Sequence, residues 1–516
     1  MTGRQAPRLA SARLWELVAA RADATPEAVL VIDERRREMT FVEFRDAVAI
    51  AAAGLAARGV GEGTVVSWQL PSWIETMVLT AALSRLGAVQ NPLIMMLREP
   101  EVDFICRQVG AQLLIVPEEF HGYGHGAMAR SVASGIDGLE VLVSDGRWPA
   151  GEPQTLPPRP AAAQGDEVRW VFYTSGTTSE PKGARHTDRG LMASAATYCG
   201  ALEPGPEDRI AALAPIAHVG GVLHLVVALM SGAAIVITDV FEPRATAQLF
   251  ADAKVTYGGN GTPFAVAFLR EQQRRRDPLF PQLKAFLIGG APRPVALHHE
   301  VRDTLGGIGL VSGYGLTECP FLAWGSPRLS ENGIAATEGR PGSGTQLRVV
   351  REDGRVAGPG GRGELRVKSD QLMVGYVDSS LDEAAFDADG FFRTGDLAFI
   401  DGEGCVNIVG RLKDVIIRNM ENISAREVED HLLTFPGLRD STAVGLPDAR
   451  TGERVCAVLV LEEHTATPTL AELCAHLEER GLNRRKLPEQ IAIVGVLPRN
   501  AMGKVVKATL VSRLGD

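Results

Sequence analysis

Short runs rich in apolar and β-branched residues alternate along this chain with segments of helical length. Such runs occur at residues 65–68, 113–116, 171–172, 235–237 and 286–288. A continuous apolar run is typical of a strand that is buried on both faces, and strands of this kind separated by helices form parallel sheets. The pattern therefore predicts an α/β fold with parallel or mixed sheets flanked by helices.

The most apolar segment, residues 221–240, is interrupted at Ser231 and Gly232. A membrane-spanning helix needs about 20 unbroken apolar residues. We therefore expect a buried helix followed by a β-branched strand at 233–238, and no membrane span. The first 29 residues also lack a continuous apolar core, because charged residues interrupt them, so we predict an amphipathic helix and no signal peptide.

Length and composition limit the possible classes of protein. A chain of 516 residues is too long for one core and suggests roughly three packed units. The net charge of −10 argues against a nucleic-acid-binding protein, which needs Lys and Arg to neutralise phosphates. The six cysteines include no Cys-x-x-Cys pair, which favours free thiols in a reducing compartment. We expect a cytoplasmic protein.

The hydrophobic pattern changes near residue 411. Residues 391–409 read as a hairpin around the turn 401–404, and the following chain has an α+β pattern with its own strands at 455–461 and 491–497. About a hundred residues suffice for an independent domain. We predict a large N-terminal domain at 1–411 and a small α+β C-terminal domain at 412–516.

A loop rich in glycine and hydroxyl side chains follows the predicted strand at 168–172 and ends in Lys182 and Gly183. Glycine allows several backbone N–H groups to face one anion, and Ser and Thr add donors. The loop is not a Walker A motif, because the required Gly-Lys-Ser/Thr spacing is missing. From composition alone, a polyphosphate site and an ordinary surface turn both remain open.

The order of residues in this loop, Tyr173-Thr174-Ser175-Gly176-Thr177-Thr178-x-x-Pro181-Lys182-Gly183, resembles the phosphate loop of the acyl-adenylate-forming enzymes. This superfamily includes acyl-CoA synthetases, peptide-synthetase adenylation domains and firefly luciferase. Six further segments resemble its motifs in the same order: residues 214–221, 289–292, 312–318, 393–396, 410–414 and 498–504. The resemblance covers almost the whole chain and implies a hinge between the two predicted domains.

The resemblance also implies roles for individual residues. ATP contacts fall on Thr174, Ser175, Gly176, Thr177, Thr178, Lys182, Gly290, Ala291, Tyr314, Gly315, Thr317, Asp396 and Arg411. Among these, Tyr314 would stack on adenine and Asp396 would accept hydrogen bonds from both ribose hydroxyls. Glu318 would hold Mg²⁺, a hard cation that prefers oxygen ligands.

The catalytic set implied by the resemblance is Lys504, Glu318, Thr174 and His218. Lys504 would bridge the substrate carboxylate and the α-phosphate. His218 would gate the acyl pocket, although a lone histidine can equally be structural. Met420 stands where the family has a glycine, which either narrows the channel for the pantetheine of CoA or is accommodated by an adapted loop.

The leading hypothesis is an acyl-CoA synthetase that uses a small-molecule carboxylic acid, ATP, Mg²⁺ and coenzyme A. The alternatives are an adenylate-forming enzyme that loads a carrier-protein thiol and a non-catalytic nucleotide-binding scaffold. The segment near His218 lacks the Phe-Asp pair by which amino-acid-activating relatives bind the substrate ammonium, so we expect a neutral acyl group. Several glycines (Gly220, Gly221, Gly258, Gly259 and Gly261) suggest room for a branched or ring-bearing acid. The sequence leaves the oligomeric state open.

Overall fold

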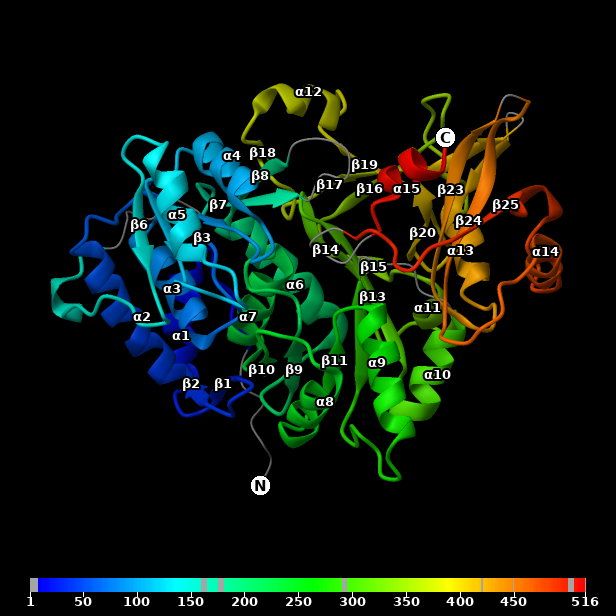
Figure 1. Cartoon of the computed structure of the whole chain (residues 1–516). Coiled ribbons are helices and arrows are strands. Elements are labelled where there is room, and N and C mark those ends of the chain that lie inside the picture. Colours follow the sequence, from blue (N-terminus) through cyan, green and yellow to red (C-terminus); the bar gives the residue numbers. More distant parts are fainter. Residues whose placement is uncertain are drawn as a thin grey trace.

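The computed structural model describes residues 8–158, 165–174, 181–289, 295–418, 421–448, 450–499 and 505–515. Within these ranges the strands form four sheets. Three of them belong to a large N-terminal domain and the fourth to a smaller C-terminal domain, which lies on the right in Figure 1. This architecture confirms the predicted fold class.

The largest sheet has nine strands and is parallel except at its edges. Its order is β15 (Arg340–Pro341), β14 (Cys319–Trp324), β13 (Leu310–Leu316), β12 (Ala285–Gly289), β11 (Tyr257–Gly259), β9 (Arg209–Ala212), β10 (Ala234–Ile237), β1 (Val29–Ile32) and β2 (Glu38–Thr40). The predicted parallel strands at 235–237 and 286–288 lie in its centre. Helices α8 (Pro243–Asp252), α9 (Thr262–Gln273) and α10 (Val295–Leu305) cover one face through a core of Phe and Leu side chains.

The second sheet has seven strands. Its order is β18 (Gly375–Tyr376), β8 (Lys182–Thr187), β7 (Val168–Thr174), β4 (Val89–Pro92), β3 (Val65–Trp68), β5 (Leu113–Val116) and β6 (Glu140–Val143). The strands from β7 to β6 are parallel, whereas β8 and β18 are antiparallel to their neighbours. Helices α4 (Glu99–Val109) and α5 (His125–Ser134) cover its outer face.

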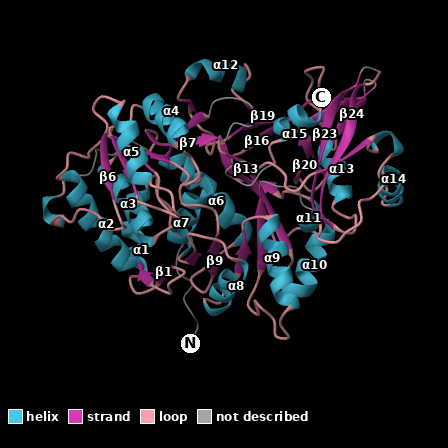
Figure 2. Ribbon diagram, viewed as in Figure 1, coloured by secondary structure: helices cyan, strands magenta, loops and turns pink. Residues whose placement is uncertain are grey.

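A layer of helices between these two sheets forms the main core (Figure 2). It consists of α1 (Leu14–Ala24), α2 (Phe41–Ala56), α3 (Ile74–Leu86), α6 (Asp188–Leu202) and α7 (Val219–Ser231). Helix α7 ends at Gly232, whose φ of 80° is a left-handed cap that glycine adopts without steric cost. The break predicted in the most apolar segment is therefore confirmed, and no helix within the described ranges is long and apolar enough to cross a membrane.

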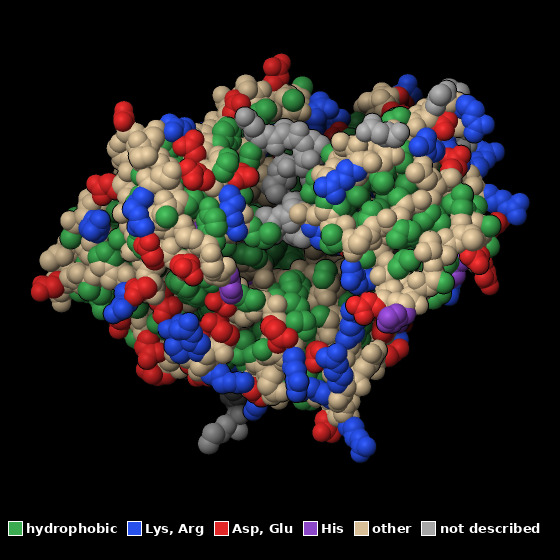
Figure 3. All heavy atoms as spheres, viewed as in Figure 1, with side chains coloured by type: hydrophobic (Ala, Val, Ile, Leu, Met, Phe, Trp, Pro, Cys, Tyr) green, Lys and Arg blue, Asp and Glu red, His purple; other side chains and the backbone are tan. Residues whose placement is uncertain are grey.

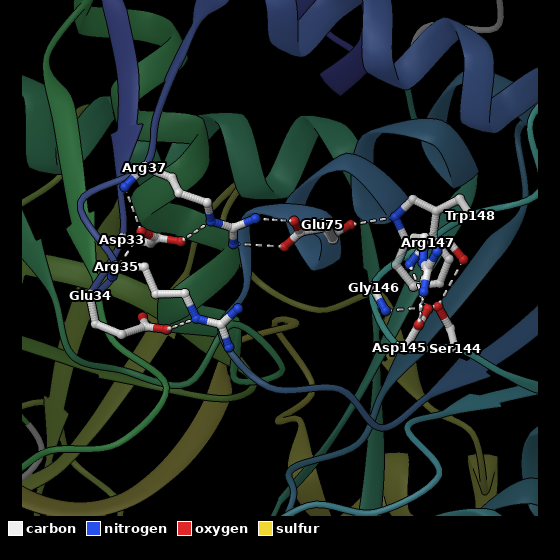
Figure 4. Close-up of polar contacts among 10 residues, drawn as sticks. All are labelled: Asp33, Glu34, Arg35, Arg37, Glu75, Ser144, Asp145, Gly146, Arg147 and Trp148. Atoms are coloured by element: carbon white, nitrogen blue, oxygen red, sulfur yellow. Dashed lines mark hydrogen bonds and ion pairs between the residues drawn. The ribbon is translucent and has the colours of Figure 1, made fainter.

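Polar contacts tie the start of this domain together (Figure 4). Arg37 donates from Nε to Asp33 Oδ2 at 2.6 Å and from Nη1 to Glu75 Oε1 at 2.6 Å. Trp148 donates its indole N–H to the Glu75 carbonyl at 2.7 Å. These bonds attach the β1–β2 turn and the connection after β6 to the first turn of α3. That connection continues into the proline-rich stretch, which includes a short 3₁₀ turn at Pro153–Thr155.

The third sheet is antiparallel and contains β16 (Gln346–Val350), β17 (Gly363–Lys368), β19 (Phe392–Ile400) and β20 (Val406–Arg411). Strands β19 and β20 are the predicted hairpin, joined by the predicted turn. The short helices α11 (Glu331–Ala336) and α12 (Asp382–Ala385) flank this region. Its apolar core includes residues of β14, so the third sheet packs against the edge of the largest one.

The C-terminal domain has a five-stranded sheet and three helices within the described residues. The strands are β21 (Val415–Arg418), β22 (Glu421–Ser424), β23 (Leu438–Asp448), β24 (Gly452–Leu461) and β25 (Gln490–Ile493), and the helices are α13 (Ala425–Leu432), α14 (Leu470–Glu479) and α15 (Lys507–Leu514). The strand predicted at 491–497 is shorter, because its pairing with β24 stops at Leu459 with Ile493, two residues before β24 itself ends. Arg426 binds Glu338 across the two domains at 3.2 Å.

Candidate functional site

Three of the predicted nucleotide-binding residues meet at one buried carboxylate. Asp396 in β19 is 3% exposed, and each of its oxygens accepts one hydrogen bond. The Tyr314 hydroxyl, from β13, donates to Oδ2 at 2.6 Å, and Arg411 Nε, at the end of β20, donates to Oδ1 at 2.7 Å. Hairpin pairing of Asp396 with Arg411 sets this geometry. Gly395, with φ at 68°, takes the left-handed backbone conformation that precedes the aspartate.

Electrostatics keep these three groups in their hydrogen-bonding forms. Desolvation and the Asp396 charge raise the pKa of Tyr314, so its hydroxyl stays protonated and donates. Desolvation lowers the pKa of Arg411, but the Asp396 carboxylate more than offsets this effect, and the guanidinium stays charged. A carboxylate with two oriented acceptor oxygens is suited to a diol, provided that the present donors move aside or share it.

A second cluster surrounds Glu318. This residue lies in the two-residue turn between β13 and β14, where Thr317 precedes it. Its Oε1 accepts a hydrogen bond from the Tyr376 hydroxyl at 2.7 Å. The ammonium of Lys182 lies 5.7 Å from the centre of the Tyr376 ring, within the range of a cation–π contact. Tyr376 thus joins two residues that the sequence predicted separately.

His186 holds the turn that carries Glu318. Its Nε2 lies 2.8 Å from the Thr317 carbonyl, and burial lowers the pKa of His186 to about 4. The ring is therefore neutral near pH 7. Its Nδ1 has no hydrogen-bond partner among the described residues, so the proton belongs on Nε2 and is donated to the carbonyl. This buried bond fixes the position of the turn.

The residues around Glu318 fit a magnesium ion that is shared with phosphates. No group of three or more His, Cys, Asp or Glu side chains within the described ranges could form a closed metal cage. Mg²⁺ is commonly bound by one or two carboxylates together with waters and substrate phosphates. Glu318 is only partly buried and offers one such carboxylate beside Lys182, which suits this type of site.

The predicted phosphate loop lies between the two strands of a hairpin. Thr174, the last residue of β7, pairs with Lys182, the first residue of β8. The loop residues between them are outside the described ranges. The same holds for several other predicted residues: Ser175, Gly176, Thr177, Thr178, Gly290, Ala291, Lys504 and Met420.

His218 caps the N-terminus of α7. Its Nδ1 accepts a hydrogen bond from the Gly220 N–H at 3.1 Å, which satisfies one of the free donors of the first turn. The ring is half-buried. The structure therefore assigns His218 a structural contact, and its predicted gating role stays a prediction.

Beyond Arg411, a 3₁₀ turn at Leu412–Asp414 leads into β21.

Several charged side chains lie close together where the chain leaves β20 for the C-terminal domain. The pKa of Lys413 is lowered by desolvation, by the Arg411 guanidinium and by Lys182, whereas Asp414 and Asp396 oppose these effects. Lys413 is therefore close enough to both clusters to feel their charges. Figure 3 shows this face of the molecule hollowed near its centre, over α6 and β14, with hydrophobic side chains on the floor of the hollow.

Tyr376 was not predicted from the sequence, and Thr394 was included only as part of the motif at 393–396, without a role of its own. Tyr376 belongs to a strand of two residues and Thr394 supports Asp396 by accepting its backbone N–H at 3.0 Å. Neither stands in an apolar run or a glycine-rich loop that would mark it. Gly315 and Thr317, which the family resemblance implied as nucleotide contacts, lie on the same hairpin as Tyr314 and Glu318.

Comparisons with known proteins agree with this arrangement. Residues 18–377 match the family described as AMP-binding enzyme, and residues 427–504 match the AMP-binding enzyme C-terminal domain. The medium-chain fatty-acid–CoA ligase of Escherichia coli K12 is 31% identical over 501 residues, which cover 95% of this chain and 88% of that protein. A feruloyl-CoA synthase from Amycolatopsis sp. is 31% identical, covering 92% of this chain and 94% of that protein.

Solved structures of similar proteins share the fold. ATP-bound MatB from Rhodopseudomonas palustris has a TM-score of 0.87 at 26% identity, covering 98% of this chain and 99% of that one. The o-succinylbenzoate CoA synthetase MenE from Bacillus subtilis, in complex with its acyl-adenylate intermediate, has a TM-score of 0.84 at 28% identity and covers 96% of this chain and 97% of that one.

Proposed function

Because the chain belongs to the AMP-binding enzyme family, we propose that it is an ATP-dependent acyl-CoA synthetase, an AMP-forming acid–CoA ligase. A carboxylate oxygen of the acid attacks the α-phosphorus of ATP, and pyrophosphate leaves. The CoA thiolate then attacks the acyl carbon, and AMP leaves. The observation that carries the proposal is the buried Asp396 carboxylate, bonded to Tyr314 and Arg411.

In this proposal Asp396 accepts the ribose hydroxyls, and Tyr314 places its ring against the adenine while its hydroxyl orients the carboxylate. Arg411 pairs with the Asp396 carboxylate and holds it in place. Lys182, beside the Tyr376 ring, binds the outer phosphates. Mg²⁺ at Glu318 would neutralise phosphate charge when bound, which lowers the barrier for one anion approaching another. The Tyr376 hydroxyl holds Glu318 in position.

The proposal divides the work between two domains, 1–411 and 412–516. Lys504 in the C-terminal domain would stabilise the charge that develops as the carboxylate meets the α-phosphate. A flexible lysine can leave when its domain turns. Lys413 would be the hinge residue, since it follows Arg411 in the 3₁₀ turn between the two parts of the chain.

CoA is the acceptor that the relatives favour. The two sequence relatives described above are named for CoA products, which supports CoA over a carrier-protein thiol. A non-catalytic scaffold has no need to retain Lys182, Glu318, Asp396 and Lys504 together. We also propose that the enzyme works in the cytoplasm, as the free cysteines suggest.

ATP–pyrophosphate exchange measured with a library of carboxylic acids tests the adenylation step. Exchange that depends on one class of acid supports the proposal, and the absence of exchange with every acid contradicts it. AMP release is then measured with and without CoA. Release that requires CoA supports a synthetase, whereas accumulation of acyl-AMP that CoA does not discharge favours the carrier-loading alternative.

A further inference from the structure

Strand β13 presents different chemistry on its two faces. The Tyr314 hydroxyl points to Asp396, and the flanking residues Gly313 and Gly315 leave the opposite face without side chains. A Cβ atom added to Gly313 would lie 2.7 Å from the Trp324 ring, and one added to Gly315 would lie 2.6 Å from the Phe321 nitrogen. Trp324 and Phe321 of β14 therefore cover the glycine face directly beside the nucleotide residues.

Four aromatic rings from three elements meet on this face. Phe321 stacks on Tyr198 of α6 with ring centres 5.8 Å apart, and it meets the edges of Trp324 at 5.2 Å and His224 of α7 at 5.9 Å. The other three rings are at most 6% exposed, whereas Phe321 is only partly buried. Phe321 is therefore the ring of this cluster that remains accessible.

The backbone holds Phe321 in an unusual conformation. Its φ of 49° lies in the left-handed region, which costs free energy for a residue with a bulky side chain. The side-chain amide of Gln371, which is 2% exposed, donates to the Phe321 carbonyl at 3.0 Å. The register of β13 with β14 also shifts at this point, between Tyr314 and Leu316. The bulge aims the ring away from the strand and toward α7.

Helix α7 places two histidines, His218 and His224, beside this cluster. His218 caps its first turn, and His224, six positions later, donates from Nδ1 to the Gly220 carbonyl at 2.6 Å. A Cβ atom added to the buried Gly220, between the two histidines, would meet only the His218 ring within 4 Å. The His224 ring folds back over this turn, because its Nδ1 reaches the Gly220 carbonyl, so the space beside Gly220 is bounded by the His218 and His224 rings.

The end of this space carries no charge. Burial lowers the pKa of His224 to about 4, so its ring is neutral near pH 7. Its Nε2 lies 3.3 Å from Asn260 Nδ2, which donates to it, and Asn260 Oδ1 accepts from the Leu213 N–H. Both polar ends of His224 are occupied within the protein. A carboxylate or sulfonate placed there would lack a cationic partner among the four rings.

Two of the glycines expected to widen the site are instead tightly packed. A Cβ atom on Gly221 would lie 2.1 Å from the Pro215 carbonyl oxygen, and one on Gly259 would lie 2.0 Å from the Leu287 carbonyl oxygen. Gly258 would meet the Phe286 ring at 3.0 Å. These positions are glycine because the backbones approach closely. The two glycines of β13 are tightly packed in the same way, against Trp324 and the Phe321 backbone, so the room comes from Gly220.

We propose that Phe321, backed by Tyr198, His224 and Trp324, closes the acyl site. The enzyme then activates acids whose acyl group is compact and carries no second charge, such as aryl or short branched-chain acids. Long alkyl chains are excluded because the cluster blocks their path, and acids with a second negative charge are excluded because nothing at the closed end pairs with it. This inference rests on the proposed function and names its substrate class.

The test measures acid-dependent pyrophosphate exchange for benzoate, phenylacetate, hexanoate, palmitate and sulfoacetate. We expect the wild type to favour the compact acids over palmitate and sulfoacetate by about 100-fold in kcat/KM, the scale at which a closed pocket rejects misfitting groups. Phe321→Gly removes the ring and relieves the left-handed strain, so it should fold. It should raise the palmitate-to-hexanoate ratio of kcat/KM by at least about tenfold.

Phe435→Ala is the matched control, because Phe435 is also a partly buried ring against a histidine, His476 at 5.1 Å, but lies in the C-terminal domain. It should leave the ratio unchanged. Phe321→Leu provides a second variant and should shift the ratio in the same direction by less. A wild type that prefers palmitate, or an unchanged ratio in both Phe321 variants, overturns this inference alone. A lack of exchange with every acid overturns the proposed function with it.

Discussion

Replacing Asp396 by asparagine is the most direct perturbation of the nucleotide site. The side chain keeps its size but loses its charge and turns one acceptor oxygen into an N–H donor, which then faces either the Tyr314 hydroxyl or Arg411. A hydrogen bond to a charged group contributes about 1.5–3 kcal/mol. The Arg411 pair counts for less than this, since the arginine side chain is 42% exposed.

The loss expected in ATP binding and catalysis is about 2–3 kcal/mol, since the ribose hydroxyls would bond to a neutral and partly mismatched group. This corresponds to a fall of about 30- to 160-fold in kcat/KM for ATP. The assay is pyrophosphate exchange with the preferred acid held at saturation and ATP varied. The KM for the acid should change little, because Asp396 and the glycine face of β13 lie on opposite sides of that strand.

Asp188→Asn is the matched control. Asp188 is 5% exposed and accepts hydrogen bonds from Trp170 Nε1 at 2.7 Å and the Leu14 N–H at 3.1 Å, at the start of α6. Its replacement should lower the midpoint of urea unfolding but leave the KM for ATP unchanged. If Asp396→Asn kept kcat/KM for ATP within about threefold of wild type, less than 1 kcal/mol, the assignment of Asp396 to the ribose would be refuted.

Three further predictions concern the C-terminal part of the chain. Lys504→Ala should reduce pyrophosphate exchange by several orders of magnitude with little change in ATP affinity, because its charge acts mainly in the transition state; exchange within about tenfold of wild type would remove it from this role. Lys413→Pro should preserve exchange but slow thioester formation, since it fixes φ at the proposed hinge; equal loss of both steps in a folded protein would count against alternation of the domains. Met420→Gly should leave CoA kinetics unchanged if the loop is adapted to methionine, whereas a lower KM for CoA would show that the side chain obstructs the channel.

The buried strands could be predicted from the sequence almost to the residue. Strands β3 and β5 have the predicted limits because a short, mainly apolar run has few other ways to bury itself. The division of residues 221–240 into α7 and β10 followed from Ser231 and Gly232. The strand at 491–497 was predicted too long, since the sequence does not show where its pairing with β24 stops.

The residues of the candidate site could be predicted only where they belong to a motif that resembles the family's. Tyr314, Asp396 and Arg411 converge as expected, although they are far apart in the chain. Tyr376 was missed because a two-residue strand leaves no periodic signal. Phe321 was missed because its direction depends on a bulge and on Gln371, fifty residues later.

Glycines were the least reliable guide. In the sequence, Gly259 and Gly220 suggest the same open space, but only the structure shows that a backbone carbonyl fills the position beside the first and that the second faces a gap. Glycine permits close packing as readily as it leaves room. Substrate size therefore could not be inferred from the glycine pattern, whereas the ring cluster at Phe321 gives a definite limit.

The central claim is that the protein forms an acyl-adenylate and then passes the acyl group to CoA. The most direct measurement follows AMP release by the wild-type protein with Mg²⁺, ATP and a compact acid that supports exchange, with and without CoA. The account predicts slow release without CoA and sustained release, equal to the acyl-CoA formed, when CoA is added. Acyl-AMP that accumulates and is not discharged by CoA would contradict it.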